Sequence, residues 1–215
     1  MPNWCYQYCT VEGPKEDLKS FIKALEFPTG DGGSIYGMNH LFECPEELSN
    51  TVAGRLDGDE QVELEKKQAE NMEKYGYENW YDWCVAKWGT KWGAVNLQIE
   101  DLIESKGIIS MQFESAWAPA IGLLEEVSRQ FPTLAIGMYC REEANFFAGY
   151  GIFKGGETII EDGVDLSDAP EPPEGDIEAE WDVWAEKHSE WNSQIDDKLA
   201  SIVDEEMSEL RNSTL

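Results

Sequence analysis

Apolar positions along the first 160 residues alternate in some stretches and recur at helical spacing in others. Residues 4–11 are rich in aromatic and β-branched side chains and are followed by Gly13-Pro14, a pattern that predicts a strand. Residues 17–25 then carry four apolar side chains on one face of a helix, with Pro28 soon after. The same reasoning predicts strands over 94–99, 108–113, 134–140 and 145–153, and a helix over 119–131.

This order is β-α-β-β-α-β with one extra strand, and an irregular, polar insertion at about residues 29–75 lies between the first helix and the second strand. A split β-α-β arrangement of this kind is typical of ferredoxin-like α+β folds. The sequence therefore predicts a ferredoxin-like domain over residues 1–160. Its helices would cover one sheet face and leave the other open or covered by later chain.

The remaining chain has a different composition. Residues 161–175 are acidic and rich in proline, which predicts a linker, and residues 176–215 predict an acidic amphipathic helix. Three alternatives stay open for its apolar side: it folds back on the open sheet face, pairs with a second copy in a homo-oligomer, or docks into a groove of a host protein. The apolar stripe runs through Ile177, Trp181, Trp184, His188, Trp191, Ile195, Leu199 and Ile202, and its tryptophans Trp181, Trp184 and Trp191 are the predicted partner-binding residues.

The charge narrows the choice of partners. The chain has 44 Asp and Glu against 16 Lys and Arg, a formal net charge of -28, and residues 161–215 alone carry 18 acidic against 3 basic residues. Phosphate repulsion argues against direct nucleic-acid binding and against anionic lipid surfaces. The acidic surface either maintains solubility or imitates DNA toward a basic host protein. No apolar run is long enough for a membrane helix, and five cysteines, an odd number, favour reduced thiols in a cytoplasm.

A candidate ligand site follows from the strand directions of the predicted fold. The starts of its first two strands and the ends of the other two meet at one edge of the sheet, where aromatic rings and scarce cations gather. Rings and cations suit a planar anionic ligand such as a nucleotide, whereas the alternative is that the tryptophans belong to the core or cap its end and that Lys91 forms a local ion pair. The predicted ligand-binding residues are Trp4, Lys87, Trp88, Lys91, Trp92, Trp117, Tyr139 and Arg141.

Catalytic and metal-binding patterns are weak. Cys5 and Cys9 have no second Cys/His pair at zinc-site spacing, so we expect no metal and no cofactor. His40 lies four residues before Cys44, but a nucleophile-base pair needs a third group to orient it. We therefore assign no catalytic residue and expect a protein that is not an enzyme.

Four ordered motifs carry a family resemblance. They are the opening Met1-Pro2-Asn3-Trp4-Cys5 with Val11-Glu12-Gly13-Pro14, Trp88-Gly89-Thr90-Lys91-Trp92, Phe113-Glu114-Ser115-Ala116-Trp117-Ala118-Pro119, and Phe146-Phe147-Ala148-Gly149. Together they resemble the Api-like proteins, a phage- and plasmid-encoded family with a ferredoxin-like domain and no assigned activity. The resemblance spans about residues 1–155 and implies a mobile-element accessory protein in a bacterial host cytoplasm.

These observations lead to a ranked expectation for function. The first is an accessory protein that counters a bacterial host process by sequestering a small anionic nucleotide signal. The alternative is an acidic, DNA-mimic-like inhibitor of a host nucleic-acid-binding or defence protein. A nucleotide-cleaving enzyme using the same pocket is the third class.

Overall fold

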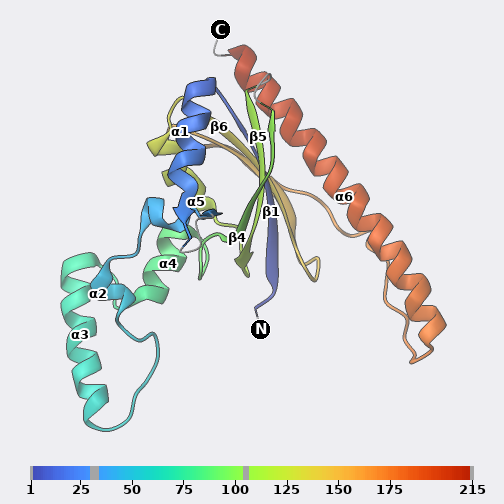
Figure 1. The fold of residues 1–215 in the computed structure, drawn as a ribbon. Helices are drawn as coiled ribbons and strands as arrows, with labels where there is room; N and C mark the ends of the chain where they lie inside the picture. The colour runs from blue at the N-terminus through green and yellow to red at the C-terminus, as the bar shows by residue number, and fades with distance from the viewer. Residues whose placement is uncertain (1, 30–33, 104–106, 214–215) are drawn as a thin grey trace.

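The computed structural model describes residues 2–29, 34–103 and 107–213. Its main feature is a six-stranded antiparallel sheet (Figure 1). The strand order across the sheet is β4 (Val95–Ile103), β5 (Ile108–Ala116), β1 (Trp4–Glu12), β6 (Ala135–Glu142), β7 (Ala148–Lys154) and β8 (Glu157–Gly163).

Four of these strands and two helices form the ferredoxin-like unit. Helix α1 (Lys15–Leu25) connects β1 to the later β4, and α5 (Ile121–Gln130) connects β5 to β6. Strand β1 lies between β5 and β6 and is antiparallel to both. The predicted split β-α-β fold is therefore the fold of the protein, with the strand directions expected from the sequence.

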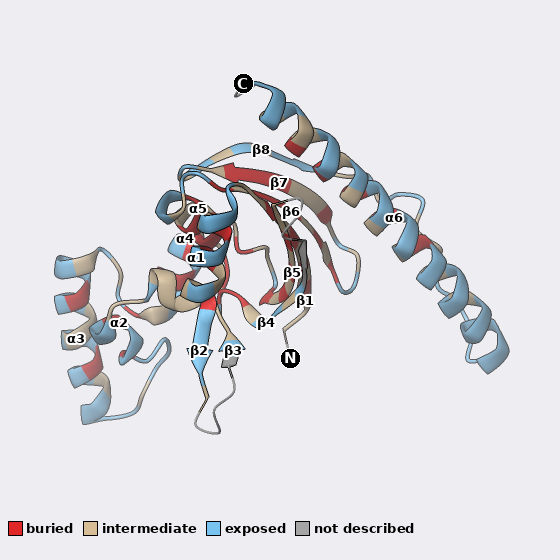
Figure 2. Ribbon diagram, turned by 45° about the horizontal axis from the view of Figure 1, so that its top comes forward, coloured by how far each residue is buried: buried red, intermediate tan, exposed pale blue. Residues whose placement is uncertain are grey.

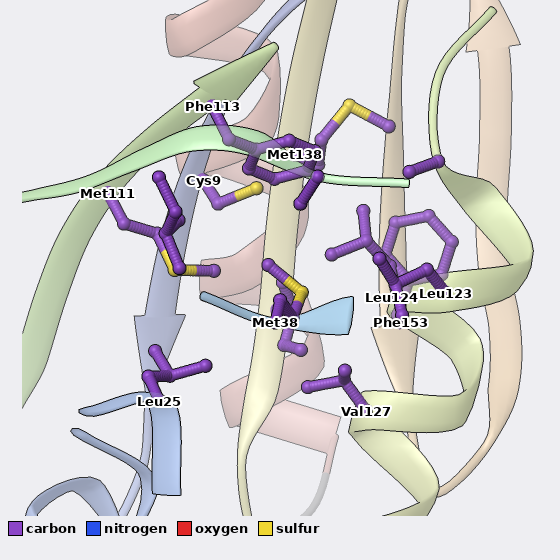
Figure 3. Close-up of a cluster of buried hydrophobic side chains, with 14 of the residues drawn as sticks. Cys9, Leu25, Met38, Met111, Phe113, Leu123, Leu124, Val127, Met138 and Phe153 are labelled. Carbon is purple, nitrogen blue, oxygen red and sulfur yellow. The ribbon is translucent and has the colours of Figure 1, made fainter. Parts of the chain in front are cut away.

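Alternation along β1 separates the two faces of the sheet. Cys5, Gln7, Cys9 and Val11 are buried, whereas the side chains between them are half-buried on the opposite face. The buried face packs against α1 and α5, whose apolar positions recur at helical spacing. Figure 3 shows part of this core, in which sulfur-containing and aliphatic side chains from sheet and helices interdigitate.

The predicted insertion projects from the sheet domain (Figure 1). It contains the hairpin of β2 (Glu26–Pro28) and β3 (Ser34–Tyr36), the 3-10 helix η1 (Asn39–Phe42), and helices α2 (Glu46–Ser49) and α3 (Asp59–Tyr75). Helix α3 is mostly exposed in Figure 2, as its polar sequence predicts, and buries only Leu64 and Asn71.

A helix that the sequence analysis did not predict follows the insertion. Helix α4 (Trp80–Trp88) begins after Asn79, whose side chain accepts hydrogen bonds from the backbone N–H groups of Tyr81 and Asp82. It ends at Gly89, which has a φ of 84° in the left-handed region. The interval before the second sheet strand is thus helical.

The sheet extends beyond the predicted domain end at residue 160. Strand β7 replaces the predicted strand 145–153, and β8 adds a second extra strand that runs to Gly163. The predicted linker consequently begins inside β8. Residues 164–177 follow without helix or strand.

Helix α6 (Glu178–Ser213) packs against the sheet face opposite α1 and α5 (Figures 1 and 2). Its buried side chains recur every four residues: Trp191, Ile195, Leu199, Val203 and Met207. They contact β6, β7 and the chain just after β8. Of the three alternatives left open by the sequence, the chain adopts the first over this half of the helix.

The buried side chains of α6 depart from the predicted apolar stripe at two places. Near its start, Ile177 is 58% and Trp181 40% exposed, and after Leu199 the stripe continues through Val203 rather than Ile202. Among the described residues, no helix has both the length and the apolarity needed to cross a bilayer.

Candidate functional site

Three separate segments bring aromatic rings together at one end of the sheet. Trp4 begins β1, Trp92 lies in the turn before β4, and Trp117 directly follows β5. The ring centroids of Trp4 and Trp92 are 5.8 Å apart. Two hydrogen bonds join the segments: Trp117 N–H donates to the Asn3 carbonyl (2.9 Å) and the Thr90 hydroxyl to the Ala116 carbonyl (2.7 Å).

Lys91 lies at the centre of this group of rings. Its Nζ is 4.7 Å from the ring centroid of Trp92 and 5.0 Å from that of Trp117. The rings of Trp80 and Tyr81, at the start of α4, follow at 5.8 and 6.0 Å. All four distances fall within the range of cation–π attraction. We call these residues, with Trp4, the Lys91 cluster.

Much of the aromatic surface of the Lys91 cluster faces solvent. Tyr81 is 37%, Trp92 36% and Trp117 46% exposed. Large rings left at the surface in one group are unusual on a monomer and mark interaction sites.

The backbone at Trp117 is strained. Its φ of 65° lies in the left-handed region, which costs a residue with a Cβ about 1–2 kcal/mol. The hydrogen bond from its N–H to Asn3 helps to hold this conformation, in which the indole is nearly half exposed. Strain of this kind persists where the surrounding structure fixes it, and it clusters at functional sites.

Half of the predicted ligand-binding residues lie in the cluster: Trp4, Lys91, Trp92 and Trp117. Trp88 does not, because its side chain is only 9% exposed and packs in the core against Trp83, with ring centroids 5.5 Å apart. Its indole N–H donates to the Phe42 carbonyl at 2.8 Å. Trp88 therefore anchors the insertion to the core, as the alternative interpretation of the tryptophans expected.

Lys87 also lies apart from the cluster. It is exposed on α4, and its Nζ lies 6.0 Å from the ring centroid of Tyr77, not over the rings around Lys91. The helix explains the separation: Lys87 precedes the C-terminal Gly89 turn, whereas Lys91 follows it.

Tyr139 and Arg141 serve the packing of α6. The Tyr139 ring stacks on Tyr8 with centroids 5.0 Å apart. The Arg141 guanidinium donates from Nε and Nη2 to the two carboxylate oxygens of Asp196 on α6, at 3.0 and 3.1 Å. In this two-point ion pair, the Arg141 side chain is 13% exposed and the Asp196 side chain 25%. The cation that was predicted to meet a phosphate is therefore already paired within the protein.

Sequence reasoning missed Trp80 and Tyr81. The available signal was Asn79, a preferred N-cap residue placed directly before an aromatic-rich run. A helix beginning there turns its first two rings toward the end of the sheet where Lys91 lies.

The predicted partner-binding tryptophans hold the linker in place. Trp181 donates its indole N–H to the Gly175 carbonyl (2.7 Å), and Trp184 to that of Pro170 (2.9 Å). Trp191 donates to Asp168 Oδ1 (3.1 Å) and is only 7% exposed. Of the three, Trp181 alone keeps a large exposed surface.

The thiols are poorly placed for nucleophilic chemistry. Burial raises the pKa of the Cys84 thiol to about 12 and also raises that of Cys9. His40 Nε2 lies 2.6 Å from the Ala24 carbonyl oxygen, so this nitrogen is engaged with the backbone. No three His, Cys, Asp or Glu side chains are grouped to hold a metal ion within the described residues.

Comparison with known proteins agrees with the fold. Residues 87–184, which contain β4 to β8, match the family model for the ferredoxin-like domain in Api92-like protein. This segment resembles an Api92-like domain. It covers a little less than half of the chain and contains three of the four motifs on which the predicted resemblance depends. The opening motif, at residues 1–14, lies outside it.

A solved structure gives a more distant likeness. The crystal structure of protein Api92 from Yersinia pseudotuberculosis aligns with 78% of this chain and 99% of its own, with 11% sequence identity and a TM-score of 0.46. A comparison with curated proteins found no match.

Proposed function

We propose that the protein acts by non-catalytic binding of a small anionic nucleotide at the Lys91 cluster. The observation that supports this most directly is a single ammonium group surrounded by aromatic rings, three of which are exposed. A base stacks on the indole of Trp92 or Trp117, and Lys91 meets the phosphate.

The physical chemistry limits the ligand. Stacking of a base on an aromatic side chain contributes about 1–3 kcal/mol, and every base offers a π-face. Only one cation of the cluster is available for phosphate, because Lys87 lies elsewhere and Arg141 is paired with Asp196. In a chain of net charge -28, this favours a ligand with few negative charges over a polyphosphate.

The proposed biological role follows from the likeness to Api-like proteins. An accessory protein of phage type that holds a nucleotide signal without converting it lowers the free concentration of that signal. It would thereby counter a bacterial host process in the host cytoplasm.

The acidic surface of α6 favours a second candidate. Asp182, Glu186, Asp197 and Glu205 are exposed on this helix, whose outer side is largely free in Figure 2. A row of carboxylates on a rigid helix can present charge to a basic host protein as DNA does. In this alternative, the protein inhibits a nucleic-acid-binding or defence protein and binds no nucleotide.

Isothermal titration with cyclic and ADP-ribose-type nucleotides tests the first candidate. We expect Lys91→Ala and Trp92→Ala to lose about tenfold or more in affinity, the order of a stacking or charge-assisted contact. Lys87→Ala is the matched control, since it removes the same charge four residues away and should bind as the parent does. Equal affinity of Lys91→Ala and the parent would exclude this location.

Recovery of the ligand separates the three classes of function. A sequestering protein returns the nucleotide intact after heat denaturation, whereas a nucleotide-cleaving enzyme using the same site returns products. A DNA mimic binds no nucleotide, and DNA displaces it from its partner.

A further inference from the structure

A cleft borders the outward-facing side chains of β1 and β5, and it is separate from the nucleotide proposal. It has a volume of about 740 Å³, which is within the size range of small-molecule sites. It lies over β1, β5 and β4, whereas α6 packs on β6 and β7. The hairpin residues Ile35 and Tyr36 close one side of it.

The cleft has an aromatic wall. Tyr6 and Tyr8 both line it from alternate positions of β1 that point away from the core, and both are half-buried. Tyr8 stacks on Tyr139, which continues the wall toward α6.

Polar side chains complete the lining. Asn96, Gln98, Gln112 and Glu114 all border the cleft. The register of β4 against β5 shifts between Val95 and Gln98, and Asn96 there has a φ of 55°. Its amide donates to Glu114 Oε2 at 3.0 Å. Such bulges re-aim side chains and recur beside functional sites.

The charge of the cleft is negative. The lining contains Glu114 and no Lys or Arg. Burial is the first cause of the raised pKa of Tyr8, and the carboxylates of Asp196 and Glu100 raise it further against an opposing effect of Arg141. Burial is also the first cause of the raised pKa of Tyr6, and the carboxylates of Glu143 and Glu114 raise this pKa further. Since Arg141 is paired with Asp196, the surrounding carboxylates leave a net negative field.

We propose that this cleft binds a small organic cation of the alkylammonium class. Ring faces attract an ammonium group, the Glu114 carboxylate pairs with it, and the amides accept its remaining N–H donors. The negative net charge of the chain raises the local concentration of such a ligand and repels anions. The site thus has the opposite electrostatic preference to the Lys91 cluster.

Titration calorimetry with spermidine tests this proposal. We expect saturable binding to one site. Glu114→Gln keeps the acceptor for Asn96 but removes the charge, and it should weaken binding about fivefold. Gln112→Glu adds a carboxylate to the lining and should tighten binding about threefold. Lys91→Ala should leave spermidine binding unchanged, so failure here and failure of the nucleotide proposal are separate results.

The control separates the cleft from general surface charge. Glu73→Gln makes the same charge change on α3, outside the cleft, and should bind as the parent does. The proposal is overturned by an absence of saturable binding, or by an equal effect of Glu73→Gln and Glu114→Gln. Binding of a neutral disaccharide or a nucleotide to this cleft in place of spermidine would also overturn it.

Discussion

Gly137 lies where α6 approaches the sheet closely. A Cβ at this position would lie 2.5 Å from Val203 Cγ1 and 3.0 Å from Met207 Cγ. Real Cβ atoms do not make contacts at the first of these distances. We therefore expect Gly137→Ala to force α6 away from β6.

The cost of this change can be bounded from packing. Overfilling a packed site destabilises by about 1–3 kcal/mol. Val203→Ala removes two methyl groups at about 0.8 kcal/mol each, so it destabilises by about 1.6 kcal/mol or more. In the double variant, the new Cβ of residue 137 occupies the space that Val203 Cγ1 leaves. The combined loss should therefore be about 1–2 kcal/mol smaller than the sum of the single losses.

Urea unfolding, followed by tryptophan fluorescence, measures these free energies. Trp191 lies on α6 and is buried against the sheet, so its emission should shift to the red if α6 detaches before the sheet unfolds. Gly163→Ala is the matched control, because its Cβ would meet only the Ala148 carbonyl oxygen at 3.6 Å, an ordinary contact. It should change stability by less than about 0.5 kcal/mol. Strictly additive losses, or a neutral Gly137→Ala, would refute the packing of α6 described above.

Three further predictions concern the cluster, the insertion and the α6 ion pair. Trp117→Gly should be about 1–2 kcal/mol more stable than Trp117→Ala in urea unfolding, because glycine relieves the positive φ; equal stability would contradict the strain. Lys74→Met should raise the pKa of Glu47 from about 2 toward its ordinary value of 4.5, because the hydrogen bond from Lys74 is the largest cause of the lowered pKa. An NMR titration that finds no change in the pKa of Glu47 would contradict this. The stabilisation from this pair should be present above about pH 4.5 and fall away as the pH drops toward 2, which limited proteolysis of the insertion can follow. Arg141→Met should destabilise by about 1.5–3 kcal/mol, and adding Asp196→Ala should recover part of that loss, because no carboxylate then remains unpaired; a larger loss in the double variant would argue against the pair.

The sheet could be predicted because the alternation of apolar and polar residues that identifies each strand lies within a few consecutive positions of the sequence. The alternation of Cys5, Gln7 and Cys9 with the residues between them assigns the two faces of β1, and the order of elements then limits the topology to very few choices. The place where Trp4, Lys91 and Trp117 meet follows from strand directions alone. No side-chain contact had to be known in advance.

The residues that were misplaced depend on contacts between distant segments. Arg141 is paired with a carboxylate 55 residues later in the chain, and nothing near Arg141 indicates this. Trp88 was assigned to the ligand site because α4 was not predicted, and on a helix its ring points into the core instead. The line of buried side chains on α6, which runs from Trp191 to Val203, is set by the sheet surface that the helix covers.

The indole N–H signals of the nine tryptophans provide the most direct test of the central claim, that the Lys91 cluster is an open ligand surface. In a two-dimensional ¹H–¹⁵N NMR titration with a cyclic nucleotide, we predict saturable shifts for the indoles of Trp4, Trp80, Trp92 and Trp117. The core and linker indoles, whose N–H groups are already bonded to Phe42, Gly175, Pro170 and Asp168, should stay in place. Shifts confined to Trp181, Trp184 and Trp191, or no shift at all, would contradict it.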